Sequence, residues 1–100
     1  MASSYEVLIA PSGQRALKKL PIQIRQVLHD EVKKLATDPY LGKRLEGEFN
    51  FLSSLKVIEG GTHYRVIYQV KEDEKLVIIR FAAPRENVYR RLLQLKAQPF

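Results

Sequence analysis

Three apolar runs in the second half of the sequence constrain the fold most, because the links between them are very short. The runs cover residues 52–58, 63–70 and 75–81. Their links read EGGT and KEDE, and the paired glycines of the first are typical of a tight turn. Strands joined by such short links must be antiparallel neighbours, so the sequence predicts an antiparallel sheet.

The middle run, HYRVIYQV, has the two-residue period of a strand with two different faces. One face carries Tyr64, Val66, Tyr68 and Val70, and the other carries Arg65, Ile67 and Gln69. An arginine between two tyrosines is unusual in a strand that could have been uniformly apolar. Arg65 therefore marks the first position for which a function has to be considered.

The N-terminal half reads as one strand followed by two helices. Residues 5–10 form the expected strand, and the turn signal PSG at 11–13 precedes a helix that starts at residue 12. Pro21 fits the first turn of a second helix, which runs to about residue 36 and ends at the sequence TDP. This second helix has an apolar stripe made of Ile24, Val27, Leu28, Val32 and Leu35.

The remaining segments complete the predicted order β-α-α-β-β-β-α. Residues 40–51 are expected to form a loop, and residues 87–96 a short C-terminal helix. The fold class is therefore α+β: two N-terminal helices pack on one face of a curved antiparallel four-stranded sheet. We expect residues 1–100 to form a single domain whose opposite sheet face is concave and exposed.

Charge and missing motifs narrow the classes of function. Seventeen Lys and Arg against eleven Asp and Glu give a net charge of +6 and a pI near 9.7, which suits a nucleic acid or an acidic protein partner. The chain has no cysteine, and its two histidines, His29 and His63, are far apart in sequence. No metal-binding, nucleotide-binding or GxSxG motif occurs, so we expect no cofactor. The sequence shows no basic leader or long apolar run, and we expect a cytoplasmic protein.

Basic residues and tyrosines gather in the late part of the sequence. Lys56 and Arg65 lie on the two strands of one predicted hairpin. Arg85 follows the last strand, Tyr89 comes one helical turn later, and Arg80 lies near the end of that strand. Salt bridges for the arginines and core positions for Tyr64, Tyr68 and Tyr89 would explain the same pattern without any catalytic function.

RNA cleavage is one reaction that such a group of residues can catalyse. The 2′-hydroxyl of the substrate attacks the adjacent phosphorus, so the reaction needs no cofactor. Its phosphorane transition state gains negative charge, which planar and permanently charged guanidinium groups stabilise well. Tyrosine can stack on a base. Proton transfer by tyrosine, lysine or arginine is slow near neutral pH, so a partner that orients the RNA is expected.

Over residues 5–95 the sequence resembles the RelE/ParE superfamily of bacterial toxins. The resemblance rests on GKRLEG, HYRVIYQV and KLVIIRFAAPRENVYRRL, in this order and spacing. It implies a RelE-like fold and a type II toxin that cleaves mRNA in the ribosomal A site as a metal-independent endoribonuclease. It also implies an antitoxin partner from the same operon, which we expect to be acidic. A ParE-like gyrase poison and a non-catalytic RNA-binding module are the alternatives.

The resemblance also implies a function for individual residues. Arg65 would stabilise the phosphorane, Arg85 would contact the scissile phosphate and Tyr89 would orient the nucleotide. Lys56 would transfer a proton or contact phosphate. Further RNA contacts are expected from Arg80, Tyr64, Lys43 and Arg44. The sequence departs from relatives at Ser54 and Pro84, where basic residues or histidine are common, so the groups that transfer protons stay open.

Overall fold

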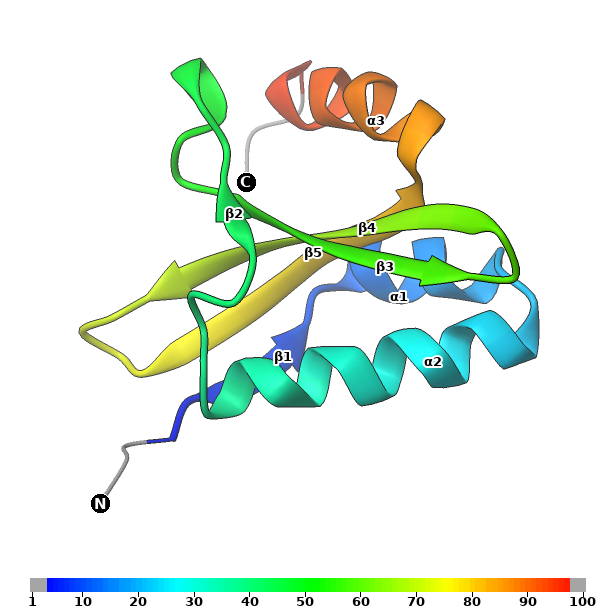
Figure 1. Cartoon of the computed structure of the whole chain (residues 1–100). Helices are drawn as coiled ribbons and strands as arrows, with labels where there is room; N and C mark the ends of the chain where they lie inside the picture. The colour runs from blue at the N-terminus through cyan, green and yellow to red at the C-terminus, as the bar shows by residue number, and fades with distance from the viewer. Residues whose placement is uncertain (1–3, 98–100) are drawn as a thin grey trace.

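The computed structural model describes residues 4–97, which form three helices, two short 3-10 helices and five strands. Figure 1 shows their arrangement. In chain order they are β1 (Glu6–Ile9), α1 (Pro11–Lys18), α2 (Ile22–Lys33), η1 (Lys34–Ala36), β2 (Lys43–Arg44), η2 (Gly47–Phe49), β3 (Ser53–Glu59), β4 (Thr62–Lys71), β5 (Leu76–Pro84) and α3 (Arg85–Ala97). The fold is α+β, as the sequence predicts, and the predicted helices and strands are all present with boundaries shifted by a few residues.

The sheet has five strands in the order β1-β5-β4-β3-β2, which corrects the expected count of four. The additional strand, β2, lies inside the segment that was expected to be a loop, where Lys43 pairs with Ser54. The sheet is also mixed, because β1 pairs in parallel with β5. Short links require antiparallel pairing only for β3, β4 and β5. β1 is separated from β5 by most of the chain, so it can pair in parallel.

The turn between β3 and β4 shows why these two strands pair as they do. Glu59 pairs with Thr62, so the turn contains only Gly60 and Gly61. Both glycines have positive φ, 60° and 78°, a conformation that side chains with a Cβ rarely adopt. A two-residue turn of this kind matches the twist of the flanking strands and fixes the register of the hairpin.

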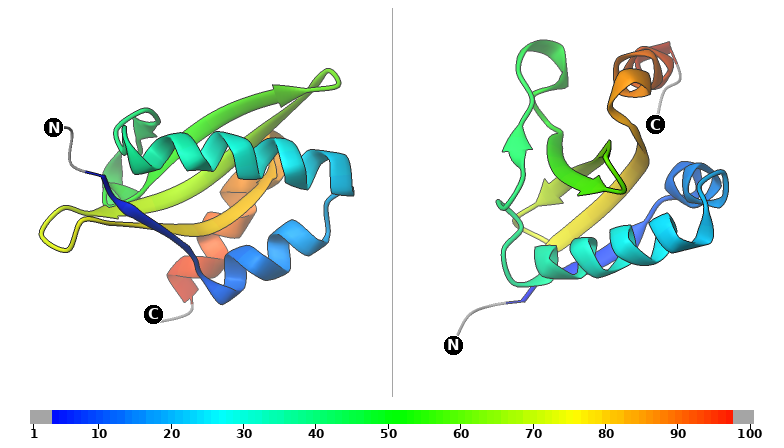
Figure 2. Two further views of the ribbon diagram at one scale, coloured as in Figure 1. Left: turned by 90° about the horizontal axis from the view of Figure 1, so that it is seen from below. Right: turned by 45° about the vertical axis from the view of Figure 1, so that its right-hand side comes forward.

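Helices cover both faces of the sheet: the two N-terminal helices pack on one face, as expected, whereas the opposite face, which was expected to be exposed, is partly covered by α3. In Figure 2, α1 and α2 lie across one side of the sheet, while α3 lies on the other. The larger core joins α2 to the sheet through Leu28, Val32, Val57, Val66 and Tyr68, among others. The second core lies under α3 and contains Ile67, Phe81, Ala83 and Leu92. The concave face is therefore open only in part.

A bulge interrupts the pairing of β4 with β5. Ile67 pairs with Phe81, but the next residue, Tyr68, pairs with Ile79, so the register passes over Arg80. A bulge adds one residue to a strand and turns the residues beyond it. α1 begins beside this point, where the hydroxyl of Ser12 donates a hydrogen bond of 2.8 Å to the carbonyl oxygen of Arg80.

Candidate functional site

Lys56 and Arg65 lie side by side on the face of the sheet that carries α3. Lys56 of β3 pairs with Arg65 of β4, and Arg65 in turn pairs with Ala83 of β5. Directly paired residues in antiparallel strands project from the same face. Ala83 belongs to the core under α3, which identifies that face. The predicted placement of these two basic residues on adjacent strands of one hairpin is therefore confirmed.

Arg65 has no partner for its charge among the residues that the structure describes. Its side chain is half-buried, and its Nε atom is buried without a hydrogen-bond partner. Among residues 4–97, the ion pairs found are His29–Asp30, Lys34–Glu31 and Lys71–Glu74, and none of them includes Arg65. Burying part of a cation without an anion costs free energy unless a ligand supplies the anion. A structural salt bridge does not explain this arginine.

The beginning of α3 lies next to this pair of residues. Arg85 is the first residue of α3 and lies two positions after Ala83, the partner of Arg65. Tyr89 follows one turn later on the same side of the helix, since residues four apart are neighbours on a helix. Arg85 is exposed and Tyr89 is 68% exposed, so both side chains can meet a ligand. The register of β5 thus brings α3 to the end of the sheet where Lys56 and Arg65 lie.

Lys43 and Arg44 lie at the edge of the sheet on β2, and both are exposed. Lys43 pairs with Ser54, which is two residues before Lys56, so Lys43 projects from the same face as Lys56. Arg44 is held by a hydrogen bond of 2.6 Å from its Nε to the carbonyl oxygen of Asn50. Lys43 extends the positive charge of this face to the edge strand, whereas Arg44, its neighbour in β2, projects from the opposite face, which contradicts its expected place beside the other RNA contacts.

Arg80 lies apart from this group and is tied to the fold. Its guanidinium donates a hydrogen bond of 2.5 Å to the side-chain oxygen of Gln69, and burial lowers its pKa. Arg80 lies at the bulge, three residues before Ala83 on β5. Arg80 therefore holds the bulge in place, and a second function in RNA binding stays a prediction.

Tyr64 does not face the site, which contradicts its expected contact with RNA. It is only 7% exposed and belongs to the core beneath α2. Neighbouring residues of a strand project from opposite faces, so its ring points away from the face that carries Arg65. The alternative interpretation, an ordinary core aromatic, is correct for Tyr64. Tyr68 lies on the same core face and is fully buried.

His63 shares the face of Arg65, and sequence reasoning missed it. The two residues are two positions apart on β4, and His63 is the diagonal neighbour of Lys56 across the hairpin. Its side chain is half-buried, and Nδ1 is buried without a hydrogen-bond partner. The two histidines are far apart in sequence, which suggested no shared site. The position of His63, two residues before Arg65 on the same strand, would have indicated that it shares the face of Arg65.

Two further properties of residues 4–97 bear on function. They contain no group of three or more His, Cys, Asp and Glu residues placed to hold a metal ion. Within the same range, the helices are too short or too polar to cross a bilayer. The site described above consists of Lys56, Arg65, Arg85 and Tyr89, with His63 beside them and Lys43 at the edge.

The comparison with protein families identifies one family over most of the chain. A model described as the ParE-like toxin of type II bacterial toxin–antitoxin systems matches residues 7–93. A comparison with curated protein sequences gives no significant match.

Solved structures of RelE toxins share the fold. The toxin–antitoxin complex RelBE2 from Mycobacterium tuberculosis has 26% identity and a TM-score of 0.73, covering 85% of this chain and 95% of that chain. A free RelE mutant from Escherichia coli has 20% identity and the same TM-score, covering 91% and 96%. An archaeal RelE–RelB complex from Pyrococcus horikoshii has 23% identity and a TM-score of 0.55, covering 82% and 96%. At identities below 25%, the likeness concerns the fold alone.

Proposed function

The chain belongs to the family of ParE-like toxins of type II bacterial toxin–antitoxin systems, and on that premise we propose that it is an endoribonuclease that cleaves mRNA on the ribosome. The observation that carries the proposal is the pair Lys56–Arg65, which lies on a partly open sheet face and forms no ion pair with a carboxylate of residues 4–97. The structural match to a RelE toxin at 26% identity supports the choice of RNA over DNA gyrase.

The proposed chemistry is transesterification within the RNA. The 2′-oxygen attacks the adjacent phosphorus, the bond from phosphorus to the 5′-oxygen breaks, and a cyclic phosphate and a 5′-hydroxyl result. The guanidinium of Arg65 donates to the nonbridging oxygens, where charge develops in the transition state. Arg85, at the end of β5, contacts the same phosphate and stabilises the departing oxygen. Tyr89 stacks on the nucleotide and sets its orientation.

Two proton transfers accompany the reaction, one from the 2′-hydroxyl and one to the 5′-oxygen. Lys56 and His63 are the groups on this face that we assign to them. Imidazole changes its charge between about pH 5 and 8, so it exchanges protons near neutral pH more readily than the other side chains of the site. His63 adds to this site the type of group that the sequence analysis considered missing.

The ribosome and an antitoxin are the proposed partners of the toxin. An open site with few groups for proton transfer needs its RNA held in a reactive conformation, which the ribosomal A site provides in this proposal. Several solved relatives are complexes of a toxin with its antitoxin, such as the intact RelBE complex from Escherichia coli. We propose that this chain likewise binds an antitoxin from its own operon, and that it acts in the cytoplasm.

Poisoning of DNA gyrase is the second candidate, because the matching family model is described as ParE-like. The two activities leave different lesions in a cell. A nuclease acting on the ribosome leaves breaks within translated mRNA, whereas a gyrase poison leaves breaks in DNA and intact mRNA.

The decisive experiment induces the toxin without its antitoxin and maps the ends of RNA and DNA across the genome. New 5′-hydroxyl ends inside coding sequences, in register with ribosome footprints, are the expected result. Arg65→Ala serves as the inactive control. DNA breaks with intact mRNA would establish the second candidate instead, and RNA binding without cleavage would reduce the protein to a binding module.

A further inference from the structure

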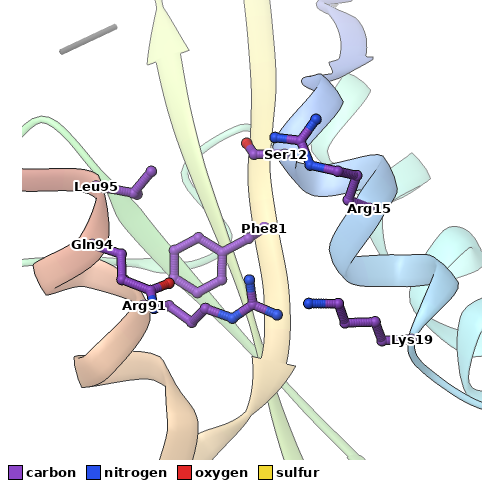
Figure 3. Close-up of a pocket in the computed structure, with 7 residues that line it drawn as sticks. All are labelled: Ser12, Arg15, Lys19, Phe81, Arg91, Gln94 and Leu95. Atoms are coloured by element: carbon purple, nitrogen blue, oxygen red, sulfur yellow. The ribbon is translucent and has the colours of Figure 1, made fainter. Parts of the chain in front are cut away.

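A groove between α1 and α3 carries three basic side chains and lies outside the proposed nuclease site. Figure 3 shows Arg15 of α1 and Lys19, which directly follows α1, projecting into it from one side and Arg91 of α3 from the other, with Phe81 of β5 between the two helices. The groove encloses about 220 Å³, and Leu95 completes its apolar part. Because the lining residues of α3 come from its later turns, the groove lies away from Arg85 and Tyr89 at its start.

The three cations of the groove are not neutralised. Arg91 and Lys19 point toward one another across the groove (Figure 3). None of the three basic side chains forms an ion pair with a carboxylate of residues 4–97, and no acidic residue lines the groove. Like charges that converge on one pocket repel each other, and an anionic ligand would replace this repulsion with attraction. The groove is therefore prepared for an anionic ligand.

The apolar part of the groove favours a peptide over a nucleic acid. Phe81 is only 2% exposed, so its ring is closed in and offers no face on which a base could stack. A nucleic acid backbone needs cations but gains little from apolar contact with Leu95. A peptide with two or more carboxylates around an apolar side chain matches both the charge and the apolar lining.

We propose that this groove binds an acidic segment of the antitoxin and that α3 stays in place when it does. The proposal rests on the toxin–antitoxin part of the proposed function. Arg91 and Lys19 can bind the same segment only while α3 remains packed on the sheet. The bound segment links α3 to α1, and α3 carries Arg85 and Tyr89 in its first turns. The antitoxin then controls the helix of the active site from its far end.

The chain offers matched controls for a test by charge reversal. Lys19→Glu and Arg91→Glu reverse charges inside the groove. Lys18→Glu and Arg90→Glu make the same change one residue earlier in the chain, where the side chains are exposed and do not line the groove. All four variants alter the net charge equally, so differences between each pair reflect position and not overall charge.

The probe is the purified antitoxin encoded beside the toxin gene, titrated calorimetrically into each toxin variant. Each groove variant should lose about tenfold or more in affinity and the double variant about a hundredfold, while each control stays within about threefold. Equal losses in groove and control variants would overturn the proposal. Ribosomal cleavage by free toxin is measured in parallel, and a loss of cleavage that exceeds the loss of antitoxin affinity would identify an RNA contact instead.

Hydrogen exchange tests whether α3 stays in place. In the complex, the amides of α3 should exchange more slowly than in the free toxin. Faster exchange of α3 in the complex would mean that the antitoxin displaces the helix, which contradicts the proposal. Both measurements use binding to the antitoxin, so they remain readable if the wild-type toxin proves not to cleave mRNA.

Discussion

At the scale of single residues, two arginines of the sheet differ in the contacts that they make within the fold. Arg80 is hydrogen-bonded to Gln69 and supports a bulge, whereas no hydrogen bond or ion pair of the Arg65 side chain is found among residues 4–97. The two residues look alike in sequence, since each follows an apolar residue in an apolar strand. Their surroundings assign them different functions, and this difference makes Arg65 the residue whose replacement is most informative.

We expect Arg65→Ala to lower single-turnover cleavage on ribosomes by about 10²–10³, because loss of one preorganised donor has an effect of this size. Arg25→Ala is the matched control. Arg25 is also half-buried with an unpartnered Nε, but it lies on α2, on the other side of the sheet. An Arg65→Ala toxin with wild-type rates, or an equal loss in Arg25→Ala, would contradict the assigned function.

His63→Gln should reduce the rate of the chemical step by about 10²-fold, because glutamine keeps a polar side chain of similar length but cannot take up and release a proton. Single-turnover cleavage on ribosomes measures the change. His29→Gln, in the exposed part of α2, should leave the rate as in the wild type. A wild-type rate in His63→Gln would remove His63 from proton transfer.

At the scale of secondary structure, one buried tyrosine holds the segment that leads into β2. The hydroxyl of Tyr68 donates to the carbonyl oxygen of Pro39 and accepts from the backbone N–H of Gly42, each at 2.9 Å. Gly42 is required there, because a Cβ would lie 2.7 Å from the same hydroxyl oxygen. The position of Lys43 and Arg44 on the edge strand therefore depends on a side chain of β4.

Tyr68→Phe should lower the free energy of unfolding by about 1–3 kcal/mol, because the amide of Gly42 and the carbonyl of Pro39 lose their partner. Urea unfolding measures the change. Tyr64→Phe is the control: Tyr64 is also buried on β4, and no hydrogen bond of its hydroxyl is found among the described residues. Equal destabilisation of the two variants would show that the two hydrogen bonds of the Tyr68 hydroxyl contribute little to stability.

The same tyrosine predicts how stability changes in alkali. Burial raises the pKa of Tyr68 above its ordinary value of 10.0, so the folded state keeps a proton that the unfolded state releases. Its stabilising contribution is complete below about pH 10 and is lost as the pH rises through the folded pKa. As the pH rises above about 10, wild-type stability should fall more steeply than that of Tyr68→Phe. An equal dependence of stability on pH in the wild type and in Tyr68→Phe would refute this prediction.

At the scale of the whole molecule, the positive charge is placed in two separate regions. One is the sheet face with Lys56 and Arg65, next to the start of α3, and the other is the groove between α1 and α3. The net charge of +6 alone fits RNA and acidic proteins equally well. In the two proposals above, the two regions with their different linings bind these two kinds of partner by different surfaces.

Ribosome association should depend strongly on salt, because steering by net charge is screened. Raising the salt from about 0.05 to 0.3 M should lower the association rate by about tenfold or more. The cleavage step within preformed complexes should change much less, since the groups involved are already in contact. Stopped-flow binding measures the association rate, and single-turnover cleavage measures the rate of the chemical step. An association rate that does not depend on salt would contradict a long-range electrostatic contribution.

The local features of the fold were predictable from the sequence. Alternation in HYRVIYQV assigned Tyr64, Val66 and Tyr68 to one face and Arg65 to the other, and the structure confirms this. The glycines of EGGT fixed the turn that pairs Lys56 with Arg65. The RNA contact expected of Tyr64 was wrong, because it rested on the residue type alone. The same alternation already put Tyr64 on the face opposite Arg65.

The sequence by itself determined the three α-helices, four of the five strands and the hairpin that carries Lys56 and Arg65, because periodicity and turn chemistry act over a few residues. Only the tertiary structure decided that β1 joins β5 in parallel, that α3 crosses to the second face and that Arg80 lies in a bulge. These outcomes depend on packing between residues up to about seventy positions apart. The same long-range packing brings α1 beside α3 and so creates the basic groove, which no stretch of the sequence contains.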